Sequence, residues 1–299
     1  MANCSQLCKA IRNPGVVRKE LLCNYLAPLF SDRKYIEIKS KLFCGYKFNL
    51  DNPITFNEKL NWLKLNDHNP LYTTMVDKVA AKKYVGDIIG QEYIVPMIAV
   101  WDDADDIDFQ SLPDRCMIKA NYDSGGIVAY RRGMNEKAVR DKVRGNKYHF
   151  NYYYRSREWP YKDVPHKVFA EEFLDNDGKV ITDYKFWCFN GEPKVMYVTC
   201  KSSDVFENFY DMDFKPLDID HGSRREVPEF EKPSSFETMK DISRKLSKDI
   251  PFVRIDFLLV KGKLYFGECT FFDWGGFRPF AGDWDKKLGE MLQLPYDNE

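Results

Sequence analysis

The residues best suited to chemistry lie near the end of the chain, between positions 251 and 272. The apolar run PFVRIDFLLV places Arg254 and Asp256 two residues apart, and the following run LYFGECTFF does the same for Glu268 and Thr270. Side chains two apart on a strand project from one face. Two carboxylates on adjacent strands, with a cation beside them, offer hard oxygen ligands for one or two Mg2+ ions.

The loop between these two strands decides whether the four side chains share a face. A two-residue loop, residues 261–262, turns Glu268 to the face opposite Asp256. A three-residue loop, residues 260–262, instead pairs Arg254 with Glu268. We expect the three-residue loop, because only that loop brings both carboxylates to one side of a regular hairpin.

An ordinary solvated hairpin with an arginine–glutamate cross-strand pair is the alternative interpretation. The apolar density of both strands argues against it, because strands this apolar are usually buried on both faces. Buried carboxylates require a metal or a charged partner. The aromatic segment 271–277 follows the second strand and leaves the same region.

Composition narrows the class of protein. The chain has 299 residues, with 45 Lys and Arg against 46 Asp and Glu, so its net charge favours neither nucleic acid nor an acidic membrane as a partner. A mean hydropathy of -0.52 and the lack of a long apolar run argue against a transmembrane span. The first residues lack the apolar core of a signal peptide, so we expect a cytoplasmic location.

The eight cysteines follow no repeated CxxC spacing. Those at 116, 188, 200 and 269 lie in apolar runs, where reduced core thiols are expected. Cys4 and Cys8 are one helical turn apart but have no second ligand pair, so a zinc site is not expected.

A second candidate for phosphate chemistry lies at 116–126. The strand CMIKA delivers Lys119 to a loop of small residues that ends in Ser124, Gly125 and Gly126. Such loops let backbone N–H groups approach phosphate oxygens closely. Neither GxxxxGK[ST] nor GxGxxG occurs, so this is neither a Walker loop nor a protein kinase. By itself the loop is equally consistent with a tight turn.

Several further elements must position these residues. Thr55 and Glu58 form a capping box that opens a helix, and a second helical run opens at Asp77-Lys78. Residues 94–100 read as a strand that Pro96 places near a sheet edge. We also expect a helical lead-in over residues 1–50 and further helices at 233–248 and 285–292. Strands are expected at 168–174, 181–189 and 194–200, with a hairpin turn at Asn190-Gly191 and an acidic loop at 102–108.

The stretch 131–167 is basic and aromatic. Such a composition can bind single-stranded nucleic acid, but the neutral charge of the whole chain argues against that partner. A polyanionic sugar, a triphosphate, or a solvated helix followed by a packed aromatic loop remain as interpretations.

The order of these pieces resembles the ATP-grasp superfamily and, more narrowly, its TupA-like family, named for teichuronopeptide biosynthesis. The resemblance covers roughly residues 50–280. The segments that carry it are ITFNEKLNWLKLND (54–67), DKVAAKKYV (77–85), IKANYDSGG (118–126), REWPYK (157–162), EEFL (171–174), DYKFWCFNG (183–191), RIDF (254–257) and FGECTF (266–271).

The resemblance implies an α+β protein with the ATP-grasp fold, in which two α+β subdomains clamp ATP beside a small helical N-terminal region. The helical region would span residues 1–70 and the ATP-grasp domain residues 71–299. Within that domain the flap subdomain would span about 110–170 and the metal-site subdomain about 171–299.

The resemblance also implies roles for individual residues. Lys78 and Lys119 would contact the ATP phosphates, and Ser124, Gly125 and Gly126 would cover them as a flap. The adenine segment would be Glu171, Glu172, Phe173 and Leu174, with Glu171 accepting from the adenine amino group and Leu174 offering backbone. Asp183 and Lys185 would reach the ribose or phosphates, and Arg254, Lys119 and Lys185 would serve catalysis. Mg2+ would be bound by Asp256, Glu268 and Thr270, although many ATP-grasp enzymes have Asn where Thr270 stands.

By the same resemblance the protein is a carboxylate–amine ligase that uses ATP and Mg2+ and acts through an acyl phosphate. The carboxylate would be a uronic acid or amino acid in cell-surface polysaccharide synthesis, at or near membrane-bound machinery on the inner membrane surface. A phosphotransferase acting on a sugar hydroxyl, and a non-catalytic module of a polysaccharide assembly complex, are the alternatives.

Overall fold

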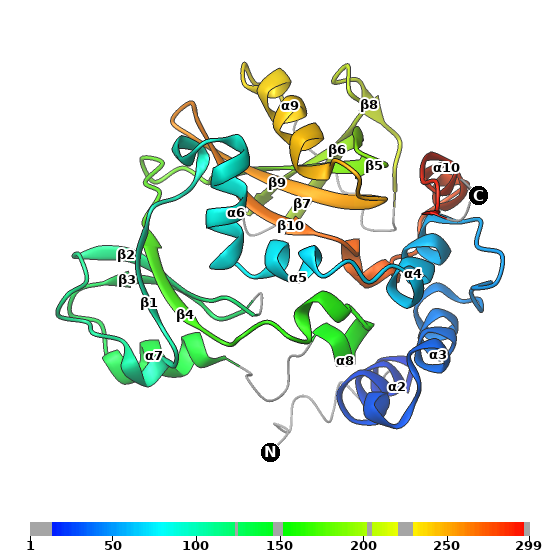
Figure 1. Cartoon of the computed structure of the whole chain (residues 1–299), viewed down its shortest axis with the longest axis horizontal. Coiled ribbons are helices and arrows are strands. Elements are labelled where there is room, and N and C mark those ends of the chain that lie inside the picture. Colours follow the sequence, from blue (N-terminus) through cyan, green and yellow to red (C-terminus); the bar gives the residue numbers. More distant parts are fainter. Residues whose placement is uncertain (1–13, 123–124, 146–151, 202–204, 221–229, 296–299) are drawn as a thin grey trace.

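Two antiparallel sheets organise the computed structural model, which describes residues 14–122, 125–145, 152–201, 205–220 and 230–295 (Figure 1). The four-stranded sheet has the order β1 (Met97–Trp101), β4 (Val168–Glu172), β2 (Arg115–Ala120) and β3 (Ile127–Arg131). The six-stranded sheet has the order β10 (Lys263–Thr270), β9 (Phe252–Val260), β5 (Thr182–Phe189), β6 (Glu192–Lys201), β7 (Val205–Tyr210) and β8 (Pro216–Leu217). Together with the helices, these sheets confirm the predicted α+β class.

Helices cover the outer faces of both sheets and occupy the space between them (Figure 1). Helix α9 (Phe236–Ser247) packs on the six-stranded sheet, and α7 (Glu136–Arg144) packs on the four-stranded sheet. The short helices α5 (Leu71–Val76) and α6 (Ala80–Ile89) run on the side of the six-stranded sheet that faces the other sheet. Each sheet thereby keeps its own apolar core, and the two cores do not merge.

The N-terminal helices join the C-terminal part of the chain. They are α2 (Pro14–Leu21), α3 (Asp32–Cys44) and α4 (Phe56–Asn66), with a π-helical turn (Leu22–Leu26) after α2. Helix α4 packs against α10 (Trp284–Met291), and α8 (Tyr152–Ser156) packs against the π-helical turn. The predicted helical region before residue 70 therefore docks on elements distant in sequence.

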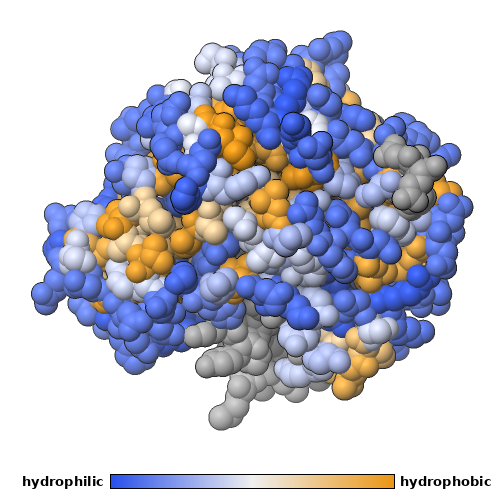
Figure 2. Space-filling model, viewed as in Figure 1, coloured by the Kyte–Doolittle hydropathy of each residue, from blue (hydrophilic) through white to orange (hydrophobic). Residues whose placement is uncertain are grey.

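Most predicted local elements are present. The Thr55–Glu58 capping box opens α4, and Asn190-Gly191 forms the turn between β5 and β6 with φ of 51° and 86°. Strand β1 lies at an edge of its sheet, directly after Pro96. Apolar residues gather on the surface over this edge (Figure 2), where Met97, Ile98 and Val100 are exposed.

The helical run predicted to open at Asp77-Lys78 begins three residues later than expected. Helix α5 ends at Val76, and α6 starts at Ala80. Between them, the Asp77 carboxylate accepts a hydrogen bond from the Val79 N–H at 2.9 Å. That bond satisfies a backbone donor at the helix start and leaves Lys78 in a turn rather than on a helical face.

The prediction of a three-residue loop between β9 and β10 is wrong. Val260 pairs with Lys263, so the loop has two residues, and both adopt positive φ, at 51° and 80°. A β-bulge between Phe266 and Cys269 then shifts the register by one residue. The bulge, rather than the loop, turns Glu268 back to the side of Asp256.

Gly267 makes this bulge possible. A Cβ atom on this residue would lie 3.1 Å from the carbonyl oxygen of Asp256 and 3.2 Å from its Cβ. A larger residue at this position would therefore push the two strands slightly apart.

A buried group of charges, which we call the anchor cluster (Lys39, Lys64 and Glu158), fixes the loop after β10. The Lys64 ammonium donates to Asn61 Oδ1 at 2.9 Å, to the Ser156 carbonyl at 2.8 Å and to the Gly275 carbonyl at 2.5 Å. The loop contains the helical turn Asp273–Gly276. Lys64 therefore ties α4 to the segment that leaves the candidate metal hairpin, and Lys39 of α3 lies 4.5 Å from the Phe277 ring centroid at the end of that segment.

In the described part of the chain, no helix has the length and apolarity required to cross a membrane.

Candidate functional site

A cavity of about 370 Å³ lies between the two sheets. Both sheets and the α5–α6 region contribute to its wall. The described residues with polar side chains that line it are Lys78, Lys82, Lys119, Glu171, Asp183, Lys185, Tyr197, Thr199, Glu207, Arg254, Asp256 and Glu268. Eight of these were predicted from the sequence as site residues, and the fold brings them to one cavity although the outermost two, Lys78 and Glu268, lie far apart in the sequence.

On the side of the four-stranded sheet, two lysines hold one buried carboxylate. Glu171 of β4 forms ion pairs with Lys119 of β2 and with Lys82 of α6, the latter at 2.8 Å. Burial opposes the charged form of Glu171, but the attraction of Lys119 and Lys82 outweighs it and lowers the pKa of the carboxyl. Burial lowers the pKa of Lys82. The predicted role of Glu171 at adenine stays a prediction.

Lys82 was not among the predicted residues. It lies four positions after Lys78 in the segment DKVAAKKYV, one turn further along the chain. That spacing was the available signal. Lys82 was missed because Lys83 follows it directly and the sequence does not distinguish the two. The fold shows that Lys82 faces the cavity, whereas Lys83 pairs with Asp87 at the surface.

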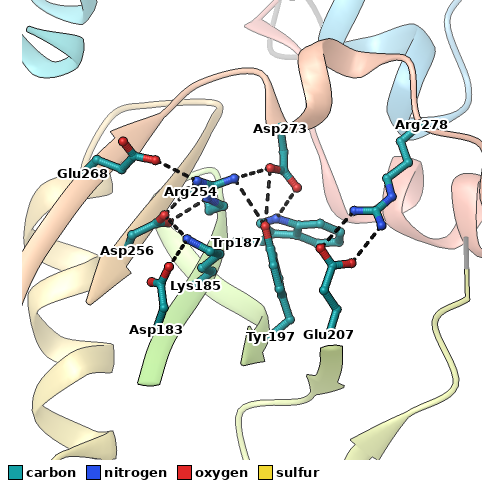
Figure 3. A network of polar contacts seen from close by, with 10 residues as sticks. All are labelled: Asp183, Lys185, Trp187, Tyr197, Glu207, Arg254, Asp256, Glu268, Asp273 and Arg278. Carbon is teal, nitrogen blue, oxygen red and sulfur yellow. Dashed lines mark hydrogen bonds and ion pairs between the residues drawn. The ribbon is translucent and has the colours of Figure 1, made fainter. Parts of the chain in front are cut away.

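On the side of the six-stranded sheet lies a second group, the cleft cluster (Asp183, Lys185, Arg254 and Asp256; Figure 3). Arg254 Nε and Nη2 donate to the two Asp256 oxygens at 2.6 and 2.7 Å. Lys185 pairs with Asp256 and, at 2.6 Å, with Asp183. Lys185 lies beside Asp256 because β5 and β9 pair in that register.

The electrostatics of the cleft cluster favour the charged forms of Asp256 and Lys185. Burial opposes ionisation of Asp256, but Arg254 and Lys185 outweigh it and lower the pKa of the carboxyl. Burial likewise opposes the charge on Lys185, and Asp256 outweighs it, so the pKa of this ammonium is raised. For Asp183 the effect of burial is larger than the attraction of Lys185, so the pKa of this carboxyl is raised. The cluster therefore holds fixed charges at the cavity wall.

Glu268 extends this cluster toward solvent. Its carboxylate accepts from Arg254 Nη2 at 3.1 Å, and the side chain is 43% exposed. Thr270 pairs with Arg254 in the strand ladder but is not among the described residues that line the cavity. Its role as a metal ligand stays a prediction.

Asp273 completes the surroundings of Arg254 and was not predicted as a site residue. It accepts from Arg254 Nη1, and its other oxygen accepts from Trp187 Nε1 at 3.0 Å (Figure 3). Tyr197 Oη lies 3.3 Å from Arg254 Nη1. The sequence showed Asp273 only within an aromatic segment, and its pairing depends on the fold of the loop.

The remaining predicted residues lie around the cavity rather than in its wall. Ser124 falls outside the described residues. Gly125 and Gly126 close the turn between β2 and β3, where the Gly126 carbonyl accepts from the Ala120 N–H at 2.8 Å. On the adenine segment, Glu172 is exposed, the Phe173 ring lies 3.6 Å from the Arg115 guanidinium carbon, and Leu174 is half-buried after the end of β4.

The oxygen donors of the cavity suit Mg2+. Among the described residues no group of three or more His, Cys, Asp or Glu side chains could hold a metal alone. At nucleotide sites, however, Mg2+ takes one or two carboxylates and completes its shell with phosphate oxygens and water. Asp256 and Glu268 both contact Arg254 and supply two such carboxylates.

Several described residues of the basic stretch 131–167 bind acidic side chains or backbone carbonyls of the protein. Arg144 pairs with Asp105 at 2.5 Å and Lys167 with Asp102 at 2.6 Å, both in the acidic loop. Arg140 donates to backbone carbonyls of the same loop. The described residues Arg140, Arg144 and Lys167 therefore bind the acidic loop, in which the side chains of Asp102 and Asp105 stay 87% and 74% exposed.

Comparison with known proteins shows what the chain resembles. The model of the family described as TupA-like ATPgrasp matches residues 58–293. A search of curated proteins finds no match.

Solved structures of ligases resemble the chain at low identity. The D-alanine–D-alanine ligase from Bacillus anthracis complexed with ATP is 13% identical, with a TM-score of 0.38, covering 66% of this chain and 53% of that one. The D-alanine–D-alanine ligase from Helicobacter pylori is 15% identical, with a TM-score of 0.41, covering 73% and 61%. The L-amino acid ligase from Bacillus licheniformis is 16% identical, with a TM-score of 0.41, covering 71% and 47%. The chain thus spans between 47% and 61% of these three ligases.

Proposed function

The chain belongs to the TupA-like ATP-grasp family and has the ATP-grasp fold, and from this premise we propose that it is a ligase that joins a carboxylate to an amine at the expense of ATP. The observation that carries the proposal is the cavity between the two sheets. Lysines enter it from both sides, and the six-stranded sheet adds Arg254 with Asp256 and Glu268. A triphosphate needs such a cationic, partly desolvated cleft.

Binding of the nucleotide falls to the lysines. Lys82 and Lys119 already converge on one carboxylate, Glu171, so their ammonium groups are positioned to hold anionic oxygens. Lys78, in the turn before α6, faces the same cavity. Asp256 and Glu268 would hold Mg2+, which supplies neutralisation of the phosphate charge when bound.

Activation of the substrate carboxylate falls to the cleft cluster. A carboxylate oxygen of the substrate attacks the γ-phosphorus, the bond from that phosphorus to the bridging oxygen breaks, and ADP leaves. Arg254 is held by Asp256, Glu268 and Asp273, so its guanidinium has a fixed orientation before the reaction. Arg254 and Lys185 thereby stabilise charge on the transferred group without reorganisation.

The acyl phosphate then gives the amide. The amine nitrogen attacks the carbonyl carbon, the carbon–oxygen bond to phosphate breaks, and the amine proton passes to water. We further propose that the carboxylate belongs to a uronic-acid-type sugar and that the amine belongs to an amino acid. This pairing is supported by the family, and it implies work in cell-surface polysaccharide synthesis.

An assay of ADP and of free phosphate tests the ligase proposal. The protein is incubated with MgATP, D-glucuronate and L-glutamate, and each component is omitted in turn. We expect equal amounts of ADP and phosphate only when both a carboxylate and an amine are present, with an amide product by mass spectrometry. Release of ADP without phosphate, together with a phosphorylated sugar, would establish a phosphotransferase instead. Failure to bind MgATP would support a non-catalytic module.

A further inference from the structure

One part of the cavity wall has no task in the binding of ATP or Mg2+. It is built by β6 and β7 and by the loop after β10, and its described residues are Tyr197, Thr199, Glu207 and Trp274. We ask what this wall recognises.

The strand register connects this wall to the cleft cluster. Asp183 of β5 pairs with Thr199 of β6, and Thr199 pairs with Glu207 of β7. Neighbouring strands lie about 4.8 Å apart, so this polar row extends about 10 Å from the cleft cluster across the sheet. A ring of hexose size beside the cleft cluster would lie along the row.

Two atoms of the row lack hydrogen-bond partners. Thr199 is 5% exposed and Asp183 is 6% exposed. Within the described chain, neither Thr199 Oγ1 nor Asp183 Oδ1 has a hydrogen-bond partner. Buried polar atoms are nearly always paired, and both side chains line the cavity. A ligand with hydroxyl groups would provide the missing partners.

Trp274 adds an aromatic side chain to this wall. Its side chain is exposed at 57%, yet its backbone adopts a left-handed conformation with φ of 49°. Bulky residues keep this conformation only where their surroundings impose it, typically at ligand-binding positions. Here the neighbours impose it, because Asp273 is bound by Arg254 and the Gly275 carbonyl by Lys64.

A guanidinium lies over one face of this exposed ring. The Arg278 carbon Cζ lies 4.0 Å from the Trp274 ring centroid. The same guanidinium donates to both Glu207 oxygens at 3.3 and 2.8 Å (Figure 3). The wall therefore combines a fixed aromatic surface with a carboxylate, a guanidinium and a hydroxyl. A planar apolar surface bordered by polar groups matches a sugar ring, which has C–H groups on its face and hydroxyls at its rim.

We propose that Thr199, Glu207 and Trp274 form the subsite for the sugar ring of the substrate. The ring packs on Trp274, its hydroxyls bond to Thr199 and Glu207, and its carboxylate reaches Arg254 and Lys185. The orientation of the sugar, with its carboxylate toward the cleft cluster, rests on the proposed ligase function.

The sharpest variant is Thr199→Val, which has nearly the same shape. Because the hydroxyl of Thr199 has no partner in the described protein, its removal should not lower the temperature of thermal unfolding. The probe is D-glucuronate, titrated by calorimetry into the protein saturated with MgADP, with D-glucose and L-glutamate as comparisons. We expect Thr199→Val to weaken D-glucuronate binding about tenfold and to leave MgADP binding unchanged.

Trp274→Leu and Trp274→Phe provide a second, independent comparison. The leucine variant should weaken D-glucuronate at least about tenfold, and the phenylalanine variant should recover most of the affinity because it keeps a ring. MgADP affinity should stay at the wild-type value in both.

The outcomes separate this inference from the proposed function. The subsite is overturned if neither Thr199→Val nor Trp274→Leu changes the affinity for D-glucuronate. It is also overturned if the wild-type protein prefers L-glutamate to both sugars at this wall. Sugar binding that depends on Thr199 and Trp274, without ATP-dependent amide formation, retains the subsite and overturns the ligase.

Discussion

The structure buries charged side chains in two places, and what surrounds the charges differs. In the anchor cluster the Lys64 ammonium donates to three oxygens, at 2.5 to 2.9 Å, and Glu158 accepts from the Ser156 hydroxyl. The cleft cluster faces a cavity instead, and it leaves Asp183 Oδ1 without a partner among the described residues. Burial of charge is common to both clusters, so burial alone does not identify a functional site.

The pKa shifts of Asp256 and Lys185 make the same distinction, whereas burial raises the pKa of Asp183 as it does that of Glu158. In the anchor cluster burial moves the groups toward their neutral forms, because it lowers the pKa of Lys64 and raises the pKa of Glu158. In the cleft cluster the pKa of Asp256 is lowered and that of Lys185 raised, in both cases because opposite charges outweigh burial. A structural cluster can lose its charge, whereas a site for a charged ligand has to keep it.

The first prediction places the largest cost to folding in the anchor cluster. Lys64→Met leaves three buried acceptors without a donor and should lower the free energy of unfolding by about 3–5 kcal/mol. Urea denaturation measures the change. Lys137→Met is the matched control, because Lys137 has an exposed side chain on α7 and pairs only with Asp141. Equal stability of the two variants would remove the structural role assigned to Lys64.

The second prediction concerns the cleft cluster and turnover. Asp256→Asn keeps the shape but removes the charge shared by Arg254 and Lys185, so ATP turnover should fall about 10²- to 10³-fold. The rate of ADP release measures this loss, with Asp213→Asn at the surface as the control. Wild-type turnover by the Asp256 variant would show that the chemistry occurs elsewhere.

The third prediction uses the pH dependence of the anchor cluster. Burial lowers the pKa of Lys39 from 10.5 to about 8. Between these values the unfolded state binds more protons than the folded state, so stability rises with pH from about 8 to about 10.5. The rise should approach roughly 3 kcal/mol, at about 1.4 kcal/mol per pKa unit.

Unfolding curves at pH 7.5 and pH 10 measure this effect as a difference between the wild type and Lys39→Met. The variant should lack the rise that Lys39 contributes. The same rise in both proteins would assign it to another group.

The smallest effect is expected at the missed residue, Lys82. Lys82→Met removes one of the two ammonium groups that face Glu171 and should weaken MgATP binding about tenfold, or ~1.4 kcal/mol. Its neighbour Lys83 pairs with Asp87 at the surface, so Lys83→Met is a control one position away. Calorimetric titration of MgATP into both variants measures the two affinities. Identical affinities would exclude Lys82 from the nucleotide site.

Local patterns in the sequence were sufficient for much of the fold. The Thr55–Glu58 capping box, the Asn190-Gly191 turn and the edge position after Pro96 depend on neighbouring residues, and all three are confirmed. The candidate residues Asp183 and Lys185 lie two apart in the strand predicted at 181–189, and both line the cavity.

Features that depend on distant contacts were missed. The bulge at Gly267 depends on how closely the opposite strand approaches, which no local pattern reports. Asp273 becomes part of the site only because the anchor cluster fixes its loop beside Arg254. The start of α6 shifted because Asp77 bonds both to Val79 and to Asn121, 44 residues away.

A crystal structure of the protein with Mg2+ and a non-hydrolysable ATP analogue tests the central claim most directly. The account predicts the triphosphate between the two sheets, with phosphate oxygens on Lys119 and Lys82 and with Mg2+ on Asp256 and Glu268. An analogue bound elsewhere, or a cavity in which Asp256 and Glu268 bind no metal beside the phosphates, would contradict it.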